Sequence, residues 1–183
     1  MDVGEANWRR YLDGEDEGFY DIVRDYKDGL LMFAYRITGD LHDAEDVVQD
    51  TFVRLAIKKP RFFGKSSFKT WLYTIARNIA IDHLRRKNKT ASLDDVLLYT
   101  DSGDDLEAGY IKSEISLGIR EAVRELKPEY AQAIWLVYFE GFANPDAARV
   151  MKKTRHQFEN LIYRARLALK RELERRGQDE DLY

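Results

Sequence analysis

One stretch of the chain, residues 68–86, constrains the fold most because its apolar residues recur at helical spacing. They form one stripe along a helix, made of Phe68, Leu72, Ile75, Ala76 and Ile79. The other faces carry aromatic and polar side chains, namely Trp71, Tyr73, Thr74, Arg77 and Asn78, and the stretch ends in the basic run 85–89. A basic helix with aromatic rings can neutralise phosphates and stack on unpaired bases. The stretch therefore predicts a helix with one buried face and one face for nucleic acid.

The rest of the chain favours the same secondary structure. Its 183 residues include only three Pro and eleven Gly, which separate long amphipathic stretches. We therefore predict an all-α protein with two small helical domains, over residues 16–89 and 112–176, joined by a flexible acidic linker over residues 90–111. Residues 1–15 are expected to form an N-terminal extension, and residues 177–183 a frayed tail.

Charge is segregated along the chain, although the formal net charge is only −3. Residues 54–89 contain eleven Lys or Arg and one acid, whereas residues 1–50 contain five basic and fourteen acidic residues. Residues 90–111 contain six acids and no base. Such segregation creates local fields of opposite sign on a small protein. A solvated face is the alternative for the basic block, but solvated faces usually mix both signs.

Several classes of function are excluded by what the sequence lacks. Cysteine is absent, which excludes disulfides, Cys-ligated zinc and thiol catalysis and fits a reducing cytoplasm. The carboxylates of residues 43–50 could bind a hard cation, but Asp46 and Asp50 share a helix face without a His partner, and the three His are scattered on separate segments. No Gly-rich phosphate loop, nucleophile motif or membrane-length apolar run occurs. We therefore expect a cytoplasmic protein that is not an enzyme, with no metal, no cofactor and no membrane insertion.

The first domain is predicted to carry a candidate partner surface on its second helix. A helix over residues 19–38 should end at Gly39, and Asp43 should cap the next helix. The buried stripe of that next helix is formed by Ala44, Val47, Val48, Thr51, Phe52 and Leu55. A second stripe, at i, i+3, i+4 and i+7, consists of Asp46, Gln49, Asp50 and Val53. A polar stripe with one apolar member suits a partner, and a solvated face is the equally open alternative.

A loop over residues 60–67 is marked by Pro and Gly, and one of its two serines should cap the long basic helix. Capture of an extruded base needs an aromatic wall and a few hydrogen-bonding groups. Phe62 and Phe63 in the loop supply aromatic rings, and Asn78 on the helix supplies both a donor and an acceptor. The alternative is that one of the two rings belongs to the core and that Asn78 merely faces solvent.

The second domain shows the pattern of a helix-turn-helix. A first helix should start at Pro128 and end at Gly141, with an inner face of Ala131, Ile134, Trp135 and Tyr138. A short helix that Asn144 caps then runs to Met151, and a tight turn over residues 152–154 leads into a longer helix. Its inner face is formed by Phe158, Leu161, Ile162, Ala165 and Leu169. The second helix of such a motif enters the major groove, although similar hairpins occur without DNA binding.

The solvent face of the last helix carries side chains of the types that contact DNA. Base edges are the predicted targets of Arg155, His156, Gln157 and Asn160. Phosphates are the predicted targets of Arg164, Lys152 and Lys153.

Two motifs resemble a known family. Residues 43–52, DAEDVVQDTF, and residues 62–78, FFGKSSFKTWLYTIARN, look like region 2 of the extracytoplasmic-function (ECF) sigma factors. Residues 126–166, from LKP to YRAR, resemble region 4 of the same family. The resemblance covers roughly residues 19–173, with the two regions in the family's order. One departure is Lys152, which lies in the turn where many relatives have Gly. The −35 sequence that another member recognises is therefore not assigned to this chain.

The resemblance implies a dissociable subunit of bacterial RNA polymerase that directs promoter-specific initiation and leaves the chemistry to the polymerase. Core polymerase would be contacted by Asp46, Gln49, Asp50 and Val53. The −10 element would be recognised and melted by Phe62, Phe63, Lys65, Lys69, Trp71, Tyr73, Arg77, Asn78, Arg85 and Arg86. The −35 element would be bound by Lys152, Lys153, Arg155, His156, Gln157, Asn160 and Arg164. An anti-sigma factor would keep the protein inactive and could hold it at the membrane.

The sequence leaves one rival function open, a free-standing helix-turn-helix regulator. Such a protein would account for the second domain but would leave the aromatic basic helix of the first domain without a role. The two functions differ in whether adding the protein lets core polymerase initiate transcription. A regulator would bind duplex DNA alone and would not support initiation by the core enzyme.

Overall fold

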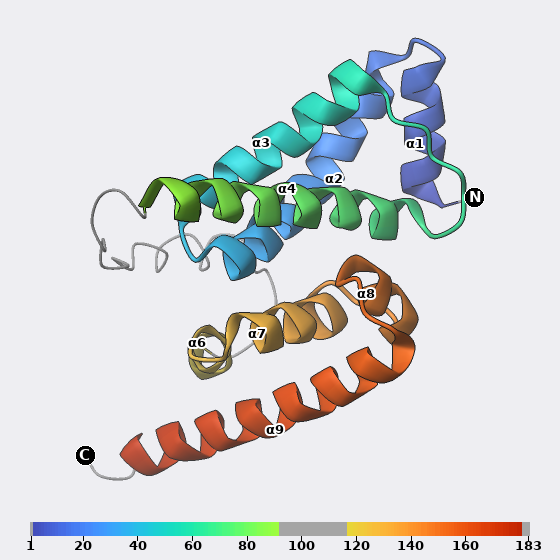
Figure 1. Ribbon diagram of the computed structural model, residues 1–183. Coiled ribbons are helices and arrows are strands. Elements are labelled where there is room, and N and C mark those ends of the chain that lie inside the picture. The colour runs from blue at the N-terminus through green and yellow to red at the C-terminus, as the bar shows by residue number, and fades with distance from the viewer. Residues whose placement is uncertain (1, 92–116, 181–183) are drawn as a thin grey trace. The chain divides into compact units, whose positions relative to one another are not determined.

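The computed structural model describes residues 2–91 and 117–180, and each of these two ranges belongs to a separate compact unit. All regular secondary structure in these described ranges is helical (Figure 1), which confirms the all-α class. The predicted acidic linker lies outside the described residues except for its first two positions, which continue a helix. The predicted tail is helical up to Glu180, and its last three residues also lie outside the described part.

The first unit is a bundle of α1 (Val3–Leu12), α2 (Asp16–Thr38), α3 (Leu41–Lys58) and α4 (Phe68–Ala91). The long helix α2 packs against each of the other three. The centre of the bundle is fully buried and consists of Ile22, Leu30, Phe33, Leu55, Phe68 and Leu72. None of the helices in the described ranges is long and apolar enough to cross a membrane.

The ends of the helices follow from local chemistry. Gly39 ends α2 in the left-handed conformation (φ 71°), as predicted. Asp40, rather than Asp43, caps α3, because its side chain accepts a hydrogen bond from the Asp43 N–H at 3.0 Å. The predicted cap was therefore wrong, and Asp43 lies in the first turn of α3 instead. Ser67 caps α4 by accepting from the Thr70 N–H at 3.1 Å.

The buried face of α4 is broader than a single stripe. Tyr73, which the sequence analysis placed on the nucleic-acid face, is fully buried, and its ring lies 5.4 Å from that of Phe33 between centroids. The reason is that α1, α2 and α3 all pack against α4 and cover more than one of its faces. In this structure Tyr73 is therefore a buried core residue and not part of an exposed nucleic-acid face.

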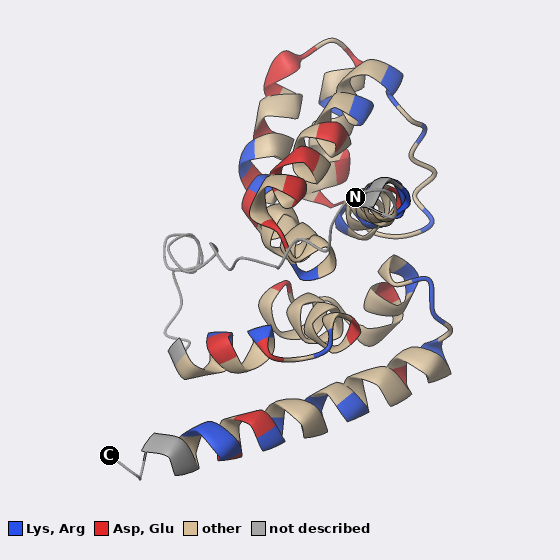
Figure 2. Ribbon diagram, turned by 60° about the vertical axis from the view of Figure 1, so that its left-hand side comes forward, with Lys and Arg blue, Asp and Glu red and all other residues tan. Residues whose placement is uncertain are grey.

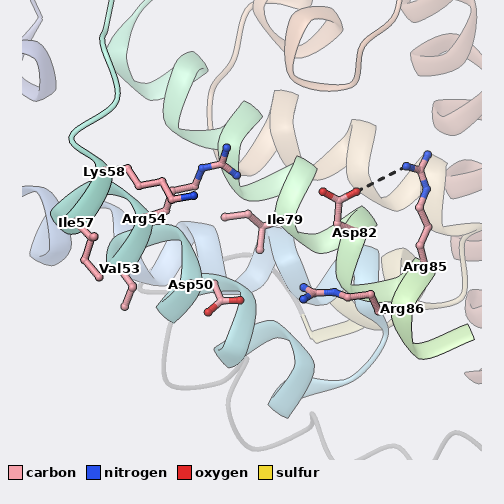
Figure 3. A pocket seen from close by; sticks show the side chains of 9 residues that line it. All are labelled: Asp50, Val53, Arg54, Ile57, Lys58, Ile79, Asp82, Arg85 and Arg86. Atoms are coloured by element: carbon pink, nitrogen blue, oxygen red, sulfur yellow. Dashed lines mark ion pairs between the residues drawn. The ribbon is translucent and has the colours of Figure 1, made fainter. Parts of the chain in front are cut away.

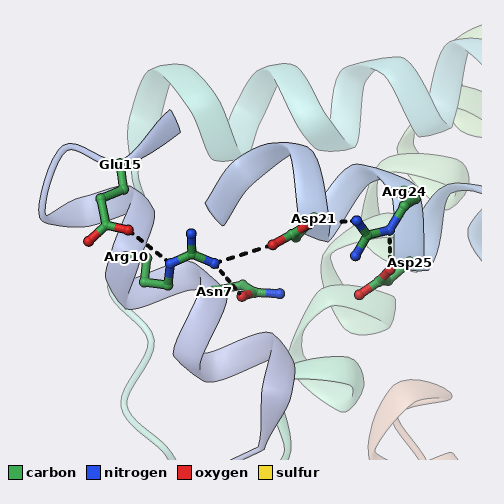
Figure 4. A network of polar contacts seen from close by, with 6 residues as sticks. All are labelled: Asn7, Arg10, Glu15, Asp21, Arg24 and Asp25. Atoms are coloured by element: carbon green, nitrogen blue, oxygen red, sulfur yellow. Dashed lines mark hydrogen bonds and ion pairs between the residues drawn. The ribbon is translucent and has the colours of Figure 1, made fainter. Parts of the chain in front are cut away.

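Helix α1 is a part of the bundle that the sequence analysis treated only as an extension. The side chain of Trp8 in α1 is almost completely buried, and an ionic network joins α1 to α2 (Figure 4). Arg10 contacts Glu15 at 2.9 Å and Asp21 at 3.3 Å. Arg24 contacts Asp21 in turn, at 2.7 Å. Both core packing and surface ion pairs therefore hold α1 against the start of α2.

The second unit contains α6 (Leu117–Arg124), α7 (Pro128–Ile134), a π-helical turn η1 (Trp135–Phe139), α8 (Asn144–Val150) and α9 (Arg155–Glu180). Helix α9 packs against α6, α7 and α8. Pro128 opens α7, as predicted. Asn144 is the first residue of α8, and its predicted cap was wrong, because the N-cap is Ala143.

The π-turn changes which side chains of the second unit face inward. The Glu140 N–H bonds to the Trp135 carbonyl, five residues back, at 3.0 Å, so the helix is wider here than an α-helix. Tyr138, predicted to be inward from α-helical spacing, is 53% exposed for this reason. The remaining predicted inner positions, Ala131, Ile134 and Trp135, are buried.

Candidate protein and nucleic-acid interfaces

The predicted core-polymerase contact forms one exposed stripe on α3. Asp46, Gln49, Asp50 and Val53 are all exposed and follow one another at the spacing of a single helix face. The opposite face of α3, which includes Ala44, Val47, Thr51 and Leu55, is buried against the bundle. The packing of α3 therefore fixes the direction in which the stripe points, away from the core.

A groove of about 580 Å³ runs between α3 and α4 beside this stripe (Figure 3). Its apolar part comes from Val53, Ile57 and Ile79, and Ile57 is 76% exposed. Its charged part comes from Asp50, Arg54, Lys58, Asp82, Arg85 and Arg86. The groove thus brings two predicted sites together, since Asp50 and Val53 were assigned to the polymerase and Arg85 and Arg86 to DNA.

An ionic cluster next to the groove joins the first turn of α3 to α4. Asp43 contacts His83 Nε2 at 3.0 Å and Lys87 Nζ at 2.5 Å. Burial alone would raise the pKa of Asp43, but the hydrogen bonds and charges of Lys87 and His83 together hold that pKa below its usual value. Asp43 is therefore ionised at neutral pH and ties α4 to α3.

The loop over residues 59–67 presents two neighbouring rings in different ways. The Phe62 ring packs 5.3 Å from that of Trp71 and 5.8 Å from that of Phe68, between centroids. The Phe63 ring is 67% exposed, and the Arg61 guanidinium lies 5.0 Å from its centroid. The sequence left open whether one of the two rings belongs to the core, and the structure makes Phe62 the packed ring and Phe63 the accessible one.

The other predicted −10 residues lie around this loop and along α4. Lys65, Arg85 and Arg86 are exposed, and four others are half-buried, namely Lys69, Trp71, Arg77 and Asn78. Figure 2 shows Lys and Arg along the loop and acidic residues gathered on α2 and α3. The structure therefore brings aromatic and basic side chains together at the start of α4, whereas Arg85 and Arg86 lie farther along that helix.

The second unit contains the predicted helix-turn-helix, formed by α8, a turn and α9. Lys152 adopts a left-handed conformation (φ 53°), the one that Gly favours, and is exposed. Thr154 and Gln157 form a reciprocal cap at the start of α9: the Thr154 N–H donates to Gln157 Oε1 at 2.9 Å, and the Gln157 N–H donates to Thr154 Oγ1 at 3.2 Å. The side-chain oxygen of Gln157 thus stabilises the start of α9, a role that its residue type alone does not predict.

The remaining predicted −35 residues are accessible, but several contact neighbours on the same helix. Arg155 pairs with Glu159 at 2.8 Å, and the Asn160 amide lies 3.1 Å from a ring nitrogen of His156. Lys153 contacts Glu129 of α7 at 2.6 Å. Arg164 is exposed near the middle of the helix face. These contacts are between partly or fully exposed groups, so each is weak enough to be exchanged for one with DNA.

Comparisons with known proteins agree with this architecture. A family model for sigma-70 region 2 matches residues 22–90, and one for sigma-70 region 4 matches residues 116–169. The ECF RNA polymerase sigma factor SigW of Bacillus subtilis is 29% identical over 170 residues, which cover 87% of this chain and 91% of SigW. The RNA polymerase sigma factor YlaC of the same species is 30% identical over 166 residues, which cover 87% of this chain and 94% of YlaC.

Solved structures share the fold. The sigma factor RpoE of Bartonella quintana, solved with the anti-sigma factor NepR, has a TM-score of 0.67 at 24% identity, covering 85% of this chain and 96% of RpoE. CnrH, solved with the cytosolic domain of CnrY, has the same TM-score and identity and covers 94% of this chain and 98% of CnrH.

Both family models fall on the two helical units in the expected order, and together they define a sigma factor of RNA polymerase. The chain belongs to the ECF sigma factors of the sigma-70 family. It is an initiation factor that directs RNA polymerase to promoters. The match to region 2 also removes the rival prediction of a free-standing helix-turn-helix regulator.

Proposed function

We propose that the chain divides the work of initiation among three surfaces. The exposed stripe of α3 docks on core polymerase, the loop over residues 59–67 with the start of α4 captures the melted −10 strand, and α9 reads the −35 element. The observation that carries the proposal is the exposed Phe63 ring beside Arg61 and the basic loop. Such a ring suits an unstacked base far better than a closed duplex.

Docking on core polymerase is assigned to α3 because its exposed stripe has no role in the bundle. Asp46 and Asp50 project two carboxylates, Gln49 an amide and Val53 an apolar contact from one face. This combination fits a basic or amide-rich helical surface, with the adjoining groove receiving an apolar side chain at Ile57. Loss of one member of a desolvated charged contact costs about 2–5 kcal/mol.

The two neighbouring rings of the loop have separate tasks in this proposal. Phe63 stacks on an unpaired base, a contact worth about 1–3 kcal/mol. Phe62 packs against Trp71 and Phe68 and holds the loop in place. Asn78 reads the edge of a base, and the cations of the loop and of α4 neutralise the backbone phosphates.

In the second unit, α9 enters the major groove with its first turns. Base edges are read by Arg155, His156, Asn160 and the amide nitrogen of Gln157, which takes no part in the cap. Lys152, Lys153 and Arg164 contact phosphates and set the register of the helix on the duplex. The chain itself carries out no catalysis, since the polymerase makes the RNA.

An anti-sigma factor is proposed as a further partner, in the cytoplasm or at the membrane. Besides the shared fold with RpoE, support comes from a largely apolar groove of about 710 Å³ in the second unit. Six of its apolar and aromatic lining residues are Ile119, Ile134, Tyr138, Phe139, Leu169 and Leu173. A groove of this kind can receive an amphipathic helix.

The decisive experiment adds the purified protein to bacterial core polymerase and measures run-off transcription from a library of genomic fragments. We expect initiation from a subset of fragments, and no initiation at all would contradict the proposed function. The variant Asp50→Arg should weaken core binding at least tenfold in a competition assay, because it places a cation against a surface that fits a carboxylate. Glu17→Arg makes the same change of charge at an exposed position of α2 and should retain parental affinity.

A further inference from the structure

Helix α1 contacts both ends of the loop that carries Phe63. On the side of α3, the Tyr11 hydroxyl donates to the Ala56 carbonyl at 3.3 Å. Lys59, the first residue after α3, has its Nζ 4.5 Å from the centroid of the Tyr11 ring. Tyr11 therefore holds the point at which the chain leaves α3 and enters the loop.

On the side of α4, a single carboxylate serves the first turns of two helices. Asp2 Oδ1 accepts from the Glu5 N–H at 2.7 Å and so caps α1. Asp2 Oδ2 accepts from the Phe68 N–H at 2.8 Å, and Phe68 is the first residue of α4. The bond from Asp2 to Phe68 bridges 66 positions of the chain and fixes the point at which the loop ends.

Aromatic packing connects the two attachment points. Trp8 is 1% exposed, and its ring centroid lies 6.2 Å from that of Phe68 and 5.8 Å from that of Trp71. Phe62 continues the cluster against Trp71. Rings therefore pack without a break from α1 to the residue next to Phe63. Figure 1 shows the loop passing α1 on its way from α3 to α4.

We propose that α1 positions the loop over residues 59–67 for promoter melting, with Asp2 as its principal positioning residue. The inference rests on the proposed function of Phe63. A loop held at both ends presents its exposed ring in one place, so base capture does not have to order the loop first. Without the Asp2–Phe68 bond, the start of α4 and the packed ring of Phe62 lose their fixed position.

The variant Asp2→Asn tests this role, because Asn caps a helix as well as Asp but has only one side-chain oxygen. It can serve α1 or α4, but not both as Asp2 does. The matched control is Asp40→Asn, which makes the same change at the cap of α3, where within the described part of the chain the side chain accepts only from the Asp43 N–H. The control lies outside the loop, the aromatic cluster and the stripe of α3.

Two measurements follow the loop and the reaction separately. In the free protein, trypsin should cut after Arg61 and Lys65 several-fold faster in Asp2→Asn than in the parent or in Asp40→Asn. In the holoenzyme, opening of a linear promoter, followed by 2-aminopurine in the −10 element, should be about tenfold slower, the effect of one lost hydrogen bond to a charged group. Affinity for core polymerase and for −35 duplex should stay at the parental level.

The possible outcomes distinguish the inference from the function on which it rests. Parental rates of cleavage and of opening in Asp2→Asn would overturn the inference, as would an equal slowing of both processes in Asp40→Asn, which would indicate a general loss of stability. If loop cleavage rises but opening is unchanged, α1 holds the loop without positioning it for melting, and the inference again fails. Failure of the parental holoenzyme to initiate would instead contradict the proposed function.

Discussion

The substitution Gly4→Ala tests how closely α1 packs on the bundle. A Cβ atom at Gly4 would lie 2.5 Å from Phe68 Cδ1 and 2.5 Å from the Tyr26 hydroxyl oxygen, closer than non-bonded atoms approach. The Phe68 ring is fully buried, and the rings of Trp8, Tyr26, Phe62 and Trp71 pack around it. We therefore expect the added methyl group to push α1 away from the start of α4.

Two opposing effects determine the size of the loss. Replacing Gly by Ala in a helix favours folding by up to about 1 kcal/mol. Overpacking a core site costs about 1–3 kcal/mol. Because two atoms lie only 2.5 Å from the added Cβ, the cost falls at the upper end of this range, and the expected net loss in the free energy of unfolding is about 2 kcal/mol. Gly118→Ala in α6 is the control, since among the described residues no atom beyond the chain neighbours and the backbone of α6 lies within 4 Å of its Cβ position, and it should stabilise the second unit by about 0.5–1 kcal/mol.

Urea denaturation followed by tryptophan fluorescence measures the first unit if Trp135 is replaced by Phe in all proteins. The remaining tryptophans, Trp8 and Trp71, belong to the first unit, so the Gly118→Ala control should leave this fluorescence midpoint at its parental value. The midpoint of the fluorescence transition should fall in Gly4→Ala. A midpoint equal to or above the parental one would show that α1 does not pack as closely as described, and it would remove the steric basis for its role beside the loop.

Two further predictions concern acid stability and DNA recognition. The pKa of Asp43 is lowered in the folded protein, so its ionised form stabilises the first unit above the unfolded pKa of about 3.9, and this contribution is lost as the pH falls through the folded pKa. Asp43→Asn should therefore flatten the dependence of stability on pH in acid titrations followed by circular dichroism. An unchanged slope would contradict the ion pairs of Asp43 with His83 and Lys87. In DNA-binding titrations, Arg164→Ala should weaken binding to all −35 duplexes and lower the salt slope by about 1. Asn160→Ala should instead reduce the binding free energy by about 1–3 kcal/mol at one base position only. Equal losses across every mutated base for both variants would show that the two roles are wrongly assigned.

Hydrophobic periodicity predicted most of the helices, because each packs one regular face on a core. The buried stripes of α3 and α9 follow from the local spacing of apolar residues. The end of α2 follows from the preference of Gly39 for the left-handed conformation. Tyr73 and Tyr138 were placed wrongly for different reasons. The first lies on a helix that three neighbours cover, and the second on a π-turn, and neither tertiary cover nor a change of helical pitch can be seen in a periodic pattern.

Helix α1 was missed although it carried a signal. Asp2 followed by Glu5 has the spacing of a helix start with an N-cap and an acid in the first turn, and Trp8 and Tyr11 continue at helical spacing. What no local pattern contains is the second bond of Asp2, to Phe68 in a distant part of the chain. Residue types in the sequence predicted the candidate surfaces. Which of Phe62 and Phe63 is packed and which is accessible became visible only from the contact between the Phe62 and Trp71 rings.

The last turns of α9 have a consequence for exchanging promoter specificity between sigma factors. Arg176 lies beyond residue 169, where the match to region 4 ends. Its guanidinium contacts Glu121 of α6 at 2.6 Å and Glu172 of α9 at 3.2 Å. A graft cut at that boundary would transfer every candidate DNA contact but leave Glu121 without this partner. A functional transplant of the −35-reading module therefore has to include α9 through Arg176, together with its own α6.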